Sequence, residues 1–280
     1  MNAPHAVSVL SAAATGQPSH ASVLSLPPAA QTHVTVRGLC KAFGGVPLYA
    51  DFNLDLPRGR IVSIFGPNGC GKSTLMNMIA GLVPMDAGEI LFDGKTLKQT
   101  KIGYVFQNYR DALFPWLSAW DNIAYPLRRG GLAAAAVQAK VDALVALFEI
   151  RFDLQRYPYE LSGGQMQTVC IMRSLATEPE VLFLDEPFSA LDFEMTLFIR
   201  AKLQEAHLAT GTTMVIVSHD LEDAVFLADR ILLLTRRPTR IAEIVPFDLP
   251  RPRQPEAVAD AEFVRVKAHT LAVFRREMNT

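Results

Sequence analysis

The segment that most constrains this chain is the glycine-rich run Gly66-Pro67-Asn68-Gly69-Cys70-Gly71-Lys72-Ser73-Thr74. It fits the pattern G-x-x-x-x-G-K-[ST], in which backbone N–H groups surround phosphate oxygens and a lysine reaches the outer ones. That pattern requires a strand before the loop and a helix after it. An apolar run at 60–65 precedes the loop, and 72–80 has helical character that ends at Gly81. The sequence therefore predicts an α/β domain whose phosphate-binding loop comprises all nine residues.

The residue types in this loop suit a nucleoside triphosphate. A helix N-terminus supplies unpaired N–H groups and the positive end of the helix dipole. Gly66, Gly69 and Gly71 let the backbone approach phosphate without a Cβ clash. Lys72 is expected to neutralise the β and γ oxygens, and Ser73 to give its hydroxyl to Mg²⁺. A chance glycine-rich turn before a surface helix is the alternative, and the flanking strand and helix argue against it.

Two carboxylates follow a second apolar strand, Val181 to Leu184. A buried strand would deliver Asp185 to the phosphate site, where it can hold Mg²⁺ directly or through water. Glu186 is then placed to polarise the attacking water as a general base. The alternative is a strand that ends in solvated acids, which the presence of Lys72 disfavours.

Two further strands end in polar residues that bear on the same chemistry. His219 closes the strand 214–218, where it would contact the γ-phosphate and orient the water. Gln107 ends the strand 102–106, where it would reach Mg²⁺ or water. Without the other motifs, His219 would be a structural or solvated residue and Gln107 would have no role. The predicted catalytic residues are Glu186, His219 and Gln107, and the predicted Mg²⁺ ligands are Ser73, Gln107 and Asp185.

A second glycine segment, Leu161-Ser162-Gly163-Gly164-Gln165, precedes a predicted helix and is also an anion-binding helix start. One chain does not need two such sites for one nucleotide. The economical interpretation is that Ser162, Gly163, Gly164 and Gln165 contact a nucleotide held by a second copy, as in a two-fold dimer. Ser189 to Asp192, just after Glu186, would lie along the same interface, with Asp192 near the nucleotide.

Composition and charge exclude several other classes. The net charge is -1 and the pI about 6.6, so no electrostatic signal for nucleic-acid binding is present. No apolar run approaches the roughly 20 residues that span a bilayer. The three cysteines, Cys40, Cys70 and Cys170, lack metal-ligand spacing and suit a reducing compartment.

The domain organisation follows from composition and hydrophobic periodicity. Residues 1–30, rich in Ala, Ser and Pro, are expected to be a disordered extension. The nucleotide domain is expected at 31–250, and a C-terminal helical tail at 251–280. Other predicted strands are 34–39, 52–56, 89–92, 213–217, 231–234 and 240–245, and other predicted helices are 118–125, 133–148, a helix after Gly164, 193–208 and 262–276.

These motifs occur in the order found in the ATPase subunits of ABC transporters, and the chain resembles that family from about Val34 to Val245. The resemblance implies a P-loop NTPase fold of the ABC ATPase type, with a RecA-like core, an antiparallel β subdomain and a helical subdomain at about 108–175. It implies two ATP molecules, with Mg²⁺, held between two subunits in a homodimer or a pair with a similar ATPase subunit. Phe43 occupies the place of an aromatic that stacks on adenine, and a core phenylalanine is the alternative.

The same resemblance implies partners. The helical subdomain would receive an integral membrane permease, placing the chain on the cytoplasmic face of the inner membrane, and an extracytoplasmic solute-binding protein would act indirectly. Leu113-Phe114-Pro115-Trp116 and Leu249-Pro250-Arg251-Pro252-Arg253 are similar to segments of the nitrate/sulfonate/taurine importer branch. An ordinary docking loop shared by many importers is the alternative. Thr168 and Met172 depart from the family pattern without touching the phosphate chemistry.

Two other functions remain to be weighed against an importer ATPase. A soluble ABC ATPase acting on ribosomes or DNA would carry two cassettes, basic extensions or long coiled coils, and this sequence has none. A nucleotide-binding regulator without turnover is disfavoured by Glu186 and His219. The solute itself is not encoded in these motifs.

Overall fold

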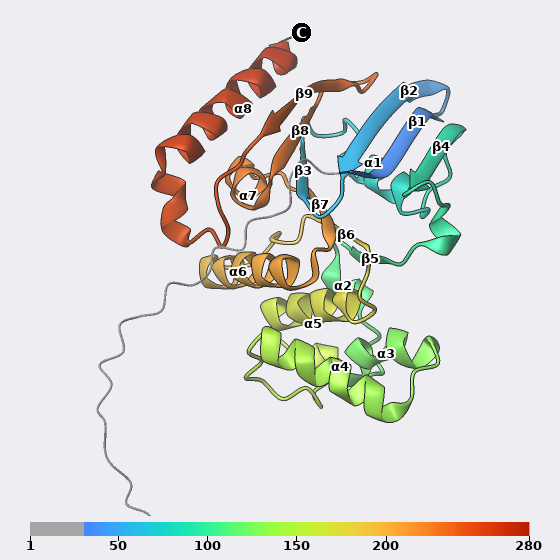
Figure 1. Ribbon diagram of the computed structural model, residues 1–280, viewed down its shortest axis with the longest axis vertical. Helices are drawn as coiled ribbons and strands as arrows, with labels where there is room; N and C mark the ends of the chain where they lie inside the picture. The colour runs from blue at the N-terminus through green and yellow to red at the C-terminus, as the bar shows by residue number, and fades with distance from the viewer. Residues whose placement is uncertain (1–30, 280) are drawn as a thin grey trace, which may run out of the picture.

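A six-stranded sheet forms the centre of the computed structural model, which describes residues 31–279 (Figure 1). The extension predicted at 1–30 lies outside the described residues. The strand order is β5 (Ile102–Val105), β6 (Val181–Asp185), β7 (Thr213–Val217), β3 (Ile61–Phe65), β8 (Arg230–Leu234) and β9 (Ile241–Pro246). Strands β5 to β8 pair in parallel, and β9 runs antiparallel to β8. The carboxyl ends of the parallel strands therefore meet at one edge of the sheet.

A smaller antiparallel sheet covers part of one face of this core. Its central strand β1 (Thr32–Phe43) pairs with β2 (Val46–Pro57) and with β4 (Ala87–Phe92). Gly44 and Gly45, with φ of 56° and 80°, make the turn between β1 and β2, a backbone region that glycine enters without strain. Helix α1 (Lys72–Ile79) shares one apolar cluster with both sheets.

The central strands divide their side chains between two apolar cores, because successive residues of a strand point to opposite faces. In β6, Val181 and Phe183 belong to the cluster formed with α1 and the antiparallel sheet. Leu182 and Leu184 belong to the cluster on the other face. That second cluster contains residues of α6 (Phe193–Thr210), α7 (Leu221–Leu227) and α8 (Ala261–Asn279). The sheet thus separates two cores that share its strands.

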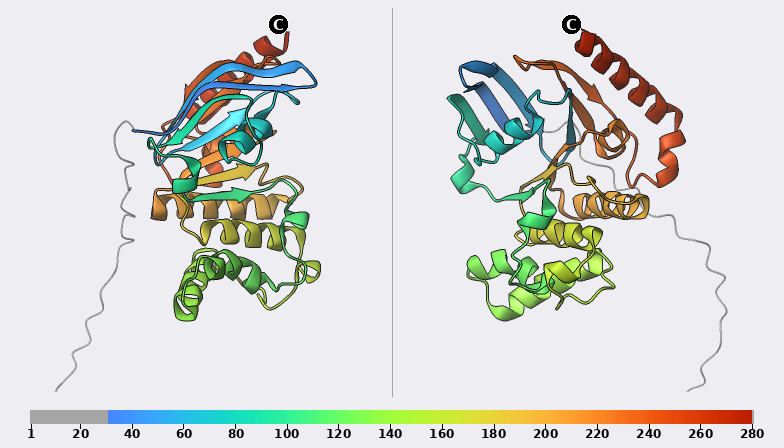
Figure 2. Two further views of the ribbon diagram at one scale, coloured as in Figure 1. Left: turned by 90° about the vertical axis from the view of Figure 1, so that its right-hand side faces the viewer. Right: turned by 180° about the vertical axis from the view of Figure 1, so that it is seen from behind.

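A group of helices lies at one end of the molecule, beyond α6 (Figures 1 and 2). It comprises α2 (Tyr109–Ala112), α3 (Ala119–Arg129), α4 (Ala134–Leu147) and α5 (Gly163–Leu175). These helices fall within the range 108–175 expected for a helical subdomain. Short 3₁₀ turns occupy Leu97–Gln99, Pro158–Glu160 and Pro255–Ala259. Among the described residues, no helix has the length and apolar character needed to cross a membrane.

Three helices differ from the sequence prediction, and one of them is the short helix α2, which was not predicted. The helix predicted to stop at 125 continues to Arg129 with Pro126 inside it. Proline removes one N–H donor, and the buried apolar face of α3, with Ile123 and Leu127 at 0% and 2% exposure, outweighs that loss. Helix α7 was not predicted. It begins after Asp220, whose side chain accepts hydrogen bonds from the N–H groups of Glu222 and Asp223.

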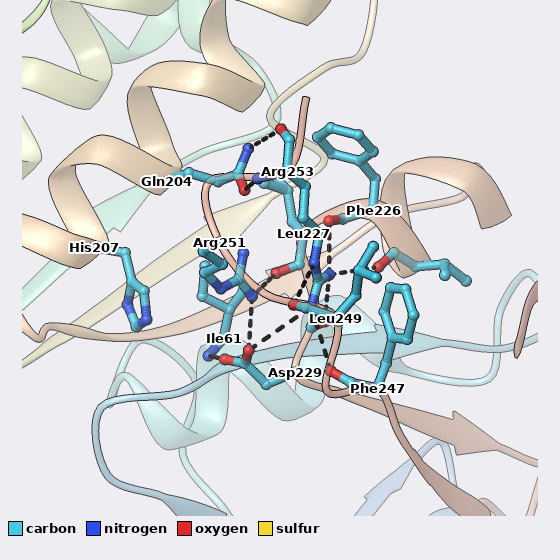
Figure 3. A network of polar contacts seen from close by, with 12 residues as sticks. Ile61, Gln204, His207, Phe226, Leu227, Asp229, Phe247, Leu249, Arg251 and Arg253 are labelled. Carbon is cyan, nitrogen blue, oxygen red and sulfur yellow. Dashed lines mark hydrogen bonds and ion pairs between the residues drawn. The ribbon is translucent and has the colours of Figure 1, made fainter. Parts of the chain in front are cut away.

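In the segment expected to open the C-terminal tail, the side chains of Arg251 and Arg253 are buried in the core (Figure 3). Arg251 donates to Oδ1 of Asp229 (2.9 Å), and Asp229 accepts the N–H of Ile61 through Oδ2 (2.7 Å). The side chain of Gln204 on α6 makes two hydrogen bonds to the backbone of Arg253: it accepts one from the N–H (2.7 Å) and donates one to the C=O (3.0 Å). The guanidinium of Arg253 donates to main-chain carbonyls of Val225, Phe226, Ala228, Phe247 and Leu249. These contacts tie the segment before α8 to α6, α7 and the core sheet.

Candidate functional site

The phosphate loop connects β3 to α1 as the sequence pattern requires. Gly66 packs so closely on β8 that a Cβ there would lie 2.9 Å from the carbonyl oxygen of Leu234. Gly71 has a φ of 99°, and a Cβ on it would meet the Leu48 side chain at 2.9 Å. Both positions therefore need glycine. Lys72 is 7% exposed, and its Nζ donates to the carbonyl of Gly66 at 2.9 Å, which holds the ammonium over the loop.

A hydroxyl and a carboxylate meet beside the start of α1. Ser73 Oγ donates to Asp185 Oδ1 over 3.0 Å, and Asp185 ends strand β6. Burial raises the pKa of Asp185, with a smaller raising effect from Glu186, while Ser73 and Lys72 oppose it. Adjacent oxygens in an octahedral Mg²⁺ shell lie about 2.9 Å apart, given Mg–O distances of about 2.1 Å. The Ser73–Asp185 pair fits such an ion, because both atoms are hard oxygen ligands at that separation.

Three strand ends converge on one carboxylate oxygen. Glu186 Oε2 accepts a hydrogen bond from Gln107 Nε2 at 2.9 Å and lies 3.1 Å from His219 Nδ1. Glu186 itself has a φ of 47°, and its N–H donates to the carbonyl of Val217 on β7. The structure thus brings together the three predicted catalytic residues next to Asp185. A carboxylate held this way can accept a proton from a nearby water, while an imidazole beside it can orient that water.

The second glycine segment begins helix α5. Ser162 caps this helix, and Ser162 and Gln165 exchange side chain to backbone hydrogen bonds of 2.9 and 3.3 Å. A Cβ on Gly163 would lie 2.8 Å from the Tyr109 hydroxyl, and one on Gly164 would lie 2.6 Å from Met195 Cγ. A side chain at either position would therefore require the Tyr109 or the Met195 side chain to move. In the described part of the molecule, no hydrogen bond joins this segment to the phosphate loop.

Two other candidate nucleotide contacts lie apart from the phosphate loop. Asp192 caps α6 by accepting the N–H of Met195 at 2.8 Å. Phe43 ends strand β1 and is 50% exposed, with Lys41 Nζ 5.3 Å from its ring centre. Such exposure excludes the alternative of a core phenylalanine, and the Lys41 ammonium lies over one face of the ring.

Sequence reasoning missed residues that contact the loop from outside. Tyr49 of β2 donates to the Gly71 carbonyl, and Thr239 and Arg237, from the connection between β8 and β9, donate to the carbonyls of Cys70 and Gly69. The short segment that contains Arg237 and Thr239 has no motif, so no sequence signal pointed to it. Cys70 itself is 2% exposed, and burial raises the pKa of its thiol.

A parallel sheet that carries a phosphate loop at its carboxyl edge, with a serine–aspartate pair beside it, defines a P-loop nucleotide-binding protein. A profile of the ABC transporter family matches residues 49–189. The chain belongs to the ABC transporter family. The resemblance seen in the motifs is confirmed, and so is the fold class that it implied.

Two kinds of curated relative illustrate this membership. The chain is 41% identical over 219 residues to the aliphatic sulfonates import ATP-binding protein SsuB of Bacillus licheniformis, covering 76% of this chain and 84% of that protein. It is 40% identical over 210 residues to the sulfate/thiosulfate import ATP-binding protein CysA of Neisseria meningitidis, covering 72% of this chain. The chain spans 58% of the length of that CysA protein.

Solved structures agree with the fold. The ATP-binding cassette MJ0796, in a dimeric post-hydrolysis state bound to ADP and Pi, matches with a TM-score of 0.67 and 30% identity. That match covers 76% of this chain and 98% of the other. The protein cbiO1 of Clostridium perfringens, part of the transporter complex cbiONQ, matches with a TM-score of 0.71 and 25% identity over 89% of this chain and 100% of the other.

Proposed function

We propose that this chain is the ATP-hydrolysing subunit of a bacterial importer for a sulfate- or sulfonate-type anion. The observation that carries the hydrolytic part is the position of Glu186, between Gln107 and His219 and beside the Ser73–Asp185 pair. The names of the SsuB and CysA relatives support the importer class and the kind of solute. The similarity of the segment Leu113–Trp116 to the nitrate/sulfonate/taurine importer branch makes taurine and nitrate further candidate solutes.

The residues divide the chemistry between them. N–H groups at the start of α1 and the Lys72 ammonium bind the phosphate oxygens of ATP. Ser73 and Asp185 would hold Mg²⁺, with Gln107 as a further ligand, and the bound ion would neutralise charge on the β- and γ-phosphates. Glu186 accepts the proton of the attacking water, and His219 keeps the carboxylate and that water aligned. The 58% exposure of the His219 side chain leaves it open to the γ-phosphate.

The site is proposed to be complete only in a pair of subunits. Ser162, at a helix start with two following glycines, would donate to the nucleotide of a second copy. Phe193, next to Asp192, is 75% exposed and would lie in the same interface. Phe43 would stack on adenine through its exposed ring. A homodimer, or a pair with a similar ATPase subunit, satisfies these requirements.

The helical group is proposed to dock an integral membrane permease. Trp116 is 69% exposed in the connection between α2 and α3, and its ring lies 5.5 Å from that of Phe114. Phe114 also contacts the 41%-exposed Tyr125, at 4.8 Å between ring centres. An exposed aromatic group of this kind is typical of a protein interface. The chain would then sit on the cytoplasmic face of the inner membrane, with a solute-binding protein acting on the far side.

The hydrolytic part is tested by phosphate release from ATP and Mg²⁺. Glu186→Gln keeps the side-chain size and removes the base, so turnover is expected to fall by at least 100-fold while ATP binding persists. Asp248→Asn, which removes a carboxylate outside the site, is the matched control and should retain turnover. A Glu186→Gln protein that releases phosphate at the wild-type rate would contradict the role given to Glu186.

A further inference from the structure

The backbone carbonyls of the phosphate loop are held from outside the loop. The three bonds are Arg237 Nε to Gly69 O (2.7 Å), Thr239 Oγ1 to Cys70 O (2.6 Å) and Tyr49 OH to Gly71 O (3.0 Å). Tyr49 belongs to β2, whereas Arg237 and Thr239 belong to the connection between β8 and β9. None of the three donors lies in the strand–loop–helix unit that defines the motif.

Holding these carbonyls sets the direction of the N–H groups that bind phosphate. In a trans peptide the C=O and the following N–H point in opposite directions. Thr239, through the Cys70 carbonyl, therefore fixes the N–H of Gly71, and Tyr49 fixes the N–H of Lys72 in the same way. In the described part of the chain, the N–H of Gly71 donates to no backbone carbonyl and remains available to an anion, and the N–H of Lys72 faces the thiol of Cys70.

Arg237 binds the peptide group that precedes the one bound by Thr239. It holds the carbonyl of Gly69, and the N–H of the same peptide, that of Cys70, donates back to the Pro67 carbonyl at 3.3 Å. This bond closes the turn at the tip of the loop. Arg237 therefore fixes the shape of that turn, while Thr239 fixes the direction of the next donor.

The connection that carries both donors is itself well fixed. Thr239 is 1% exposed, and its N–H donates to the carbonyl of Leu48 on β2 at 2.8 Å. At its base, Thr235 and Arg240 exchange two hydrogen bonds of 3.0 Å each. The Leu48 side chain also fills the space next to Gly71. Strand β2, the β8–β9 connection and the phosphate loop therefore interlock.

We propose that Thr239 and Arg237 are positioning residues for the nucleotide, which orient the N–H donors of the phosphate loop before ATP arrives. The proposal rests on the function proposed above and extends it to residues outside the motif. Donors that are already aligned need no reorganisation when an anion binds, and this makes binding stronger. Neither residue needs to touch the nucleotide to have this effect.

The first variant pair tests Thr239. Thr239→Val keeps the shape and removes the donor, so binding of a non-hydrolysable ATP analogue with Mg²⁺ is expected to weaken roughly 3- to 10-fold by calorimetry. Thr239→Ser restores the donor and should bind within about twofold of the wild type. Amide hydrogen exchange at Gly71 and Lys72 should be faster in Thr239→Val and normal in Thr239→Ser. A merely structural role would lower the unfolding free energy without moving these two amides.

The second pair tests Arg237, whose exposed side chain can be changed without disturbing the core. Arg237→Lys keeps the charge but lacks the Nε donor, so it is expected to bind the analogue as weakly as Arg237→Ala, roughly 3-fold below the wild type. Arg240→Ala removes an equal charge from an exposed neighbouring position and is the matched control. Full rescue by Arg237→Lys, or an equal loss in Arg240→Ala, would mean that charge alone attracts the nucleotide and would overturn the assignment.

The outcomes for this inference and for the proposed function are separate. If the wild-type chain hydrolyses ATP and the Thr239 and Arg237 variants bind the analogue as tightly as it does, the inference is overturned and the proposed function stands. A wild-type chain that binds the analogue but releases no phosphate would overturn the hydrolytic function, while the binding losses in the variants would still support the positioning role. A wild-type chain that binds no nucleotide would overturn both.

Discussion

His33 is a buried imidazole at the start of β1, where two structural units meet. It is 1% exposed, and its Nδ1 lies 2.7 Å from the Thr213 hydroxyl on β7 of the core sheet. Burial, and next the charge of Arg58, lower the pKa of His33 to about 4. The folded protein therefore keeps this ring neutral at pH values where the unfolded chain would protonate it.

This difference predicts an acid dependence of stability. The pKa of His33 is about 4 when folded and about 6.5 when unfolded, so below pH 6.5 the unfolded chain binds the extra proton. The contribution of His33 to the free energy of unfolding is complete above pH 6.5 and falls by up to about 3 kcal/mol as the pH approaches 4. Urea unfolding at pH 7, 5.5 and 4.5 measures it. His33→Gln should flatten this slope, and an unchanged slope would contradict the assignment.

Residue spacing along the chain explains which site residues could be predicted. Gln107, Glu186 and His219 each follow a buried strand, and parallel strands bring their carboxyl ends to one edge, so their meeting was predictable. Thr239 contacts a loop residue 169 positions away from a segment that has no pattern. The same limit hid the core packing of Arg253, because a charged residue in a proline-rich segment gives the signal of an exposed linker.

Among the elements, the connection between α2 and α3 is unusually well fixed for an exposed loop. Asn122 of α3 is fully buried and donates to the carbonyls of Phe114 and Leu117 at 3.1 Å each. Its Oδ1 accepts the N–H of Phe114 at 2.9 Å. The loop can therefore present Trp116 in one conformation, which lowers the entropic cost of docking.

We expect Trp116→Ala to separate docking from hydrolysis. Loss of an exposed aromatic anchor should lower solute uptake in vesicles with the permease about 30-fold, because such anchors contribute about 2 kcal/mol. Phosphate release by the isolated subunit should stay within twofold. Val264→Ala, at a 52% exposed position on α8, serves as the comparison and should change neither quantity. Equal losses of uptake and ATPase activity would mean that Trp116 packs the domain.

The segment before α8 supplies a second test at the level of elements. Arg253→Met leaves buried carbonyls of α7 and the β9 segment without a donor, and each such group carries a desolvation cost. The free energy of unfolding in urea is expected to fall by about 3 kcal/mol or more. Arg265→Met, on the exposed face of α8 at 66% side-chain exposure, should leave the free energy of unfolding unchanged within the error of the measurement. Equal effects of the two substitutions would show that the buried hydrogen bonds of Arg253 do not contribute to the free energy of unfolding.

At the scale of the whole molecule, the two glycine segments begin two different helices. The phosphate loop leads into α1 beside the core sheet, and Ser162 begins α5 in the helical group. The fold class, including both subdomains, was predictable because these motifs occur in a fixed order.

Pairing is expected to depend on the nucleotide. Glu186→Gln with ATP and Mg²⁺ should run as a dimer in light scattering, because the bound triphosphate persists between the two chains. Removing Mg²⁺ with a chelator should return it to a monomer. Adding Ser162→Glu places a negative charge where the partner's phosphates would lie, and should prevent dimer formation without loss of folded structure. A double variant that still dimerises would contradict the proposed interface.

The buried arginines also bear on how the chain is made. During synthesis the N-terminal part of a domain leaves the ribosome before the C-terminal part, and the domain then folds as a unit. Arg253 supplies the donors for carbonyls 25 to 28 positions before it, at Ala228, Phe226 and Val225. Until residue 253 has emerged, the backbone carbonyls at the end of α7 lack the hydrogen-bond donor that they have in the folded protein. The phosphate loop is held by Arg237 and Thr239, which emerge shortly before Arg253, so the loop and the core of the nascent chain are completed at nearly the same stage of synthesis.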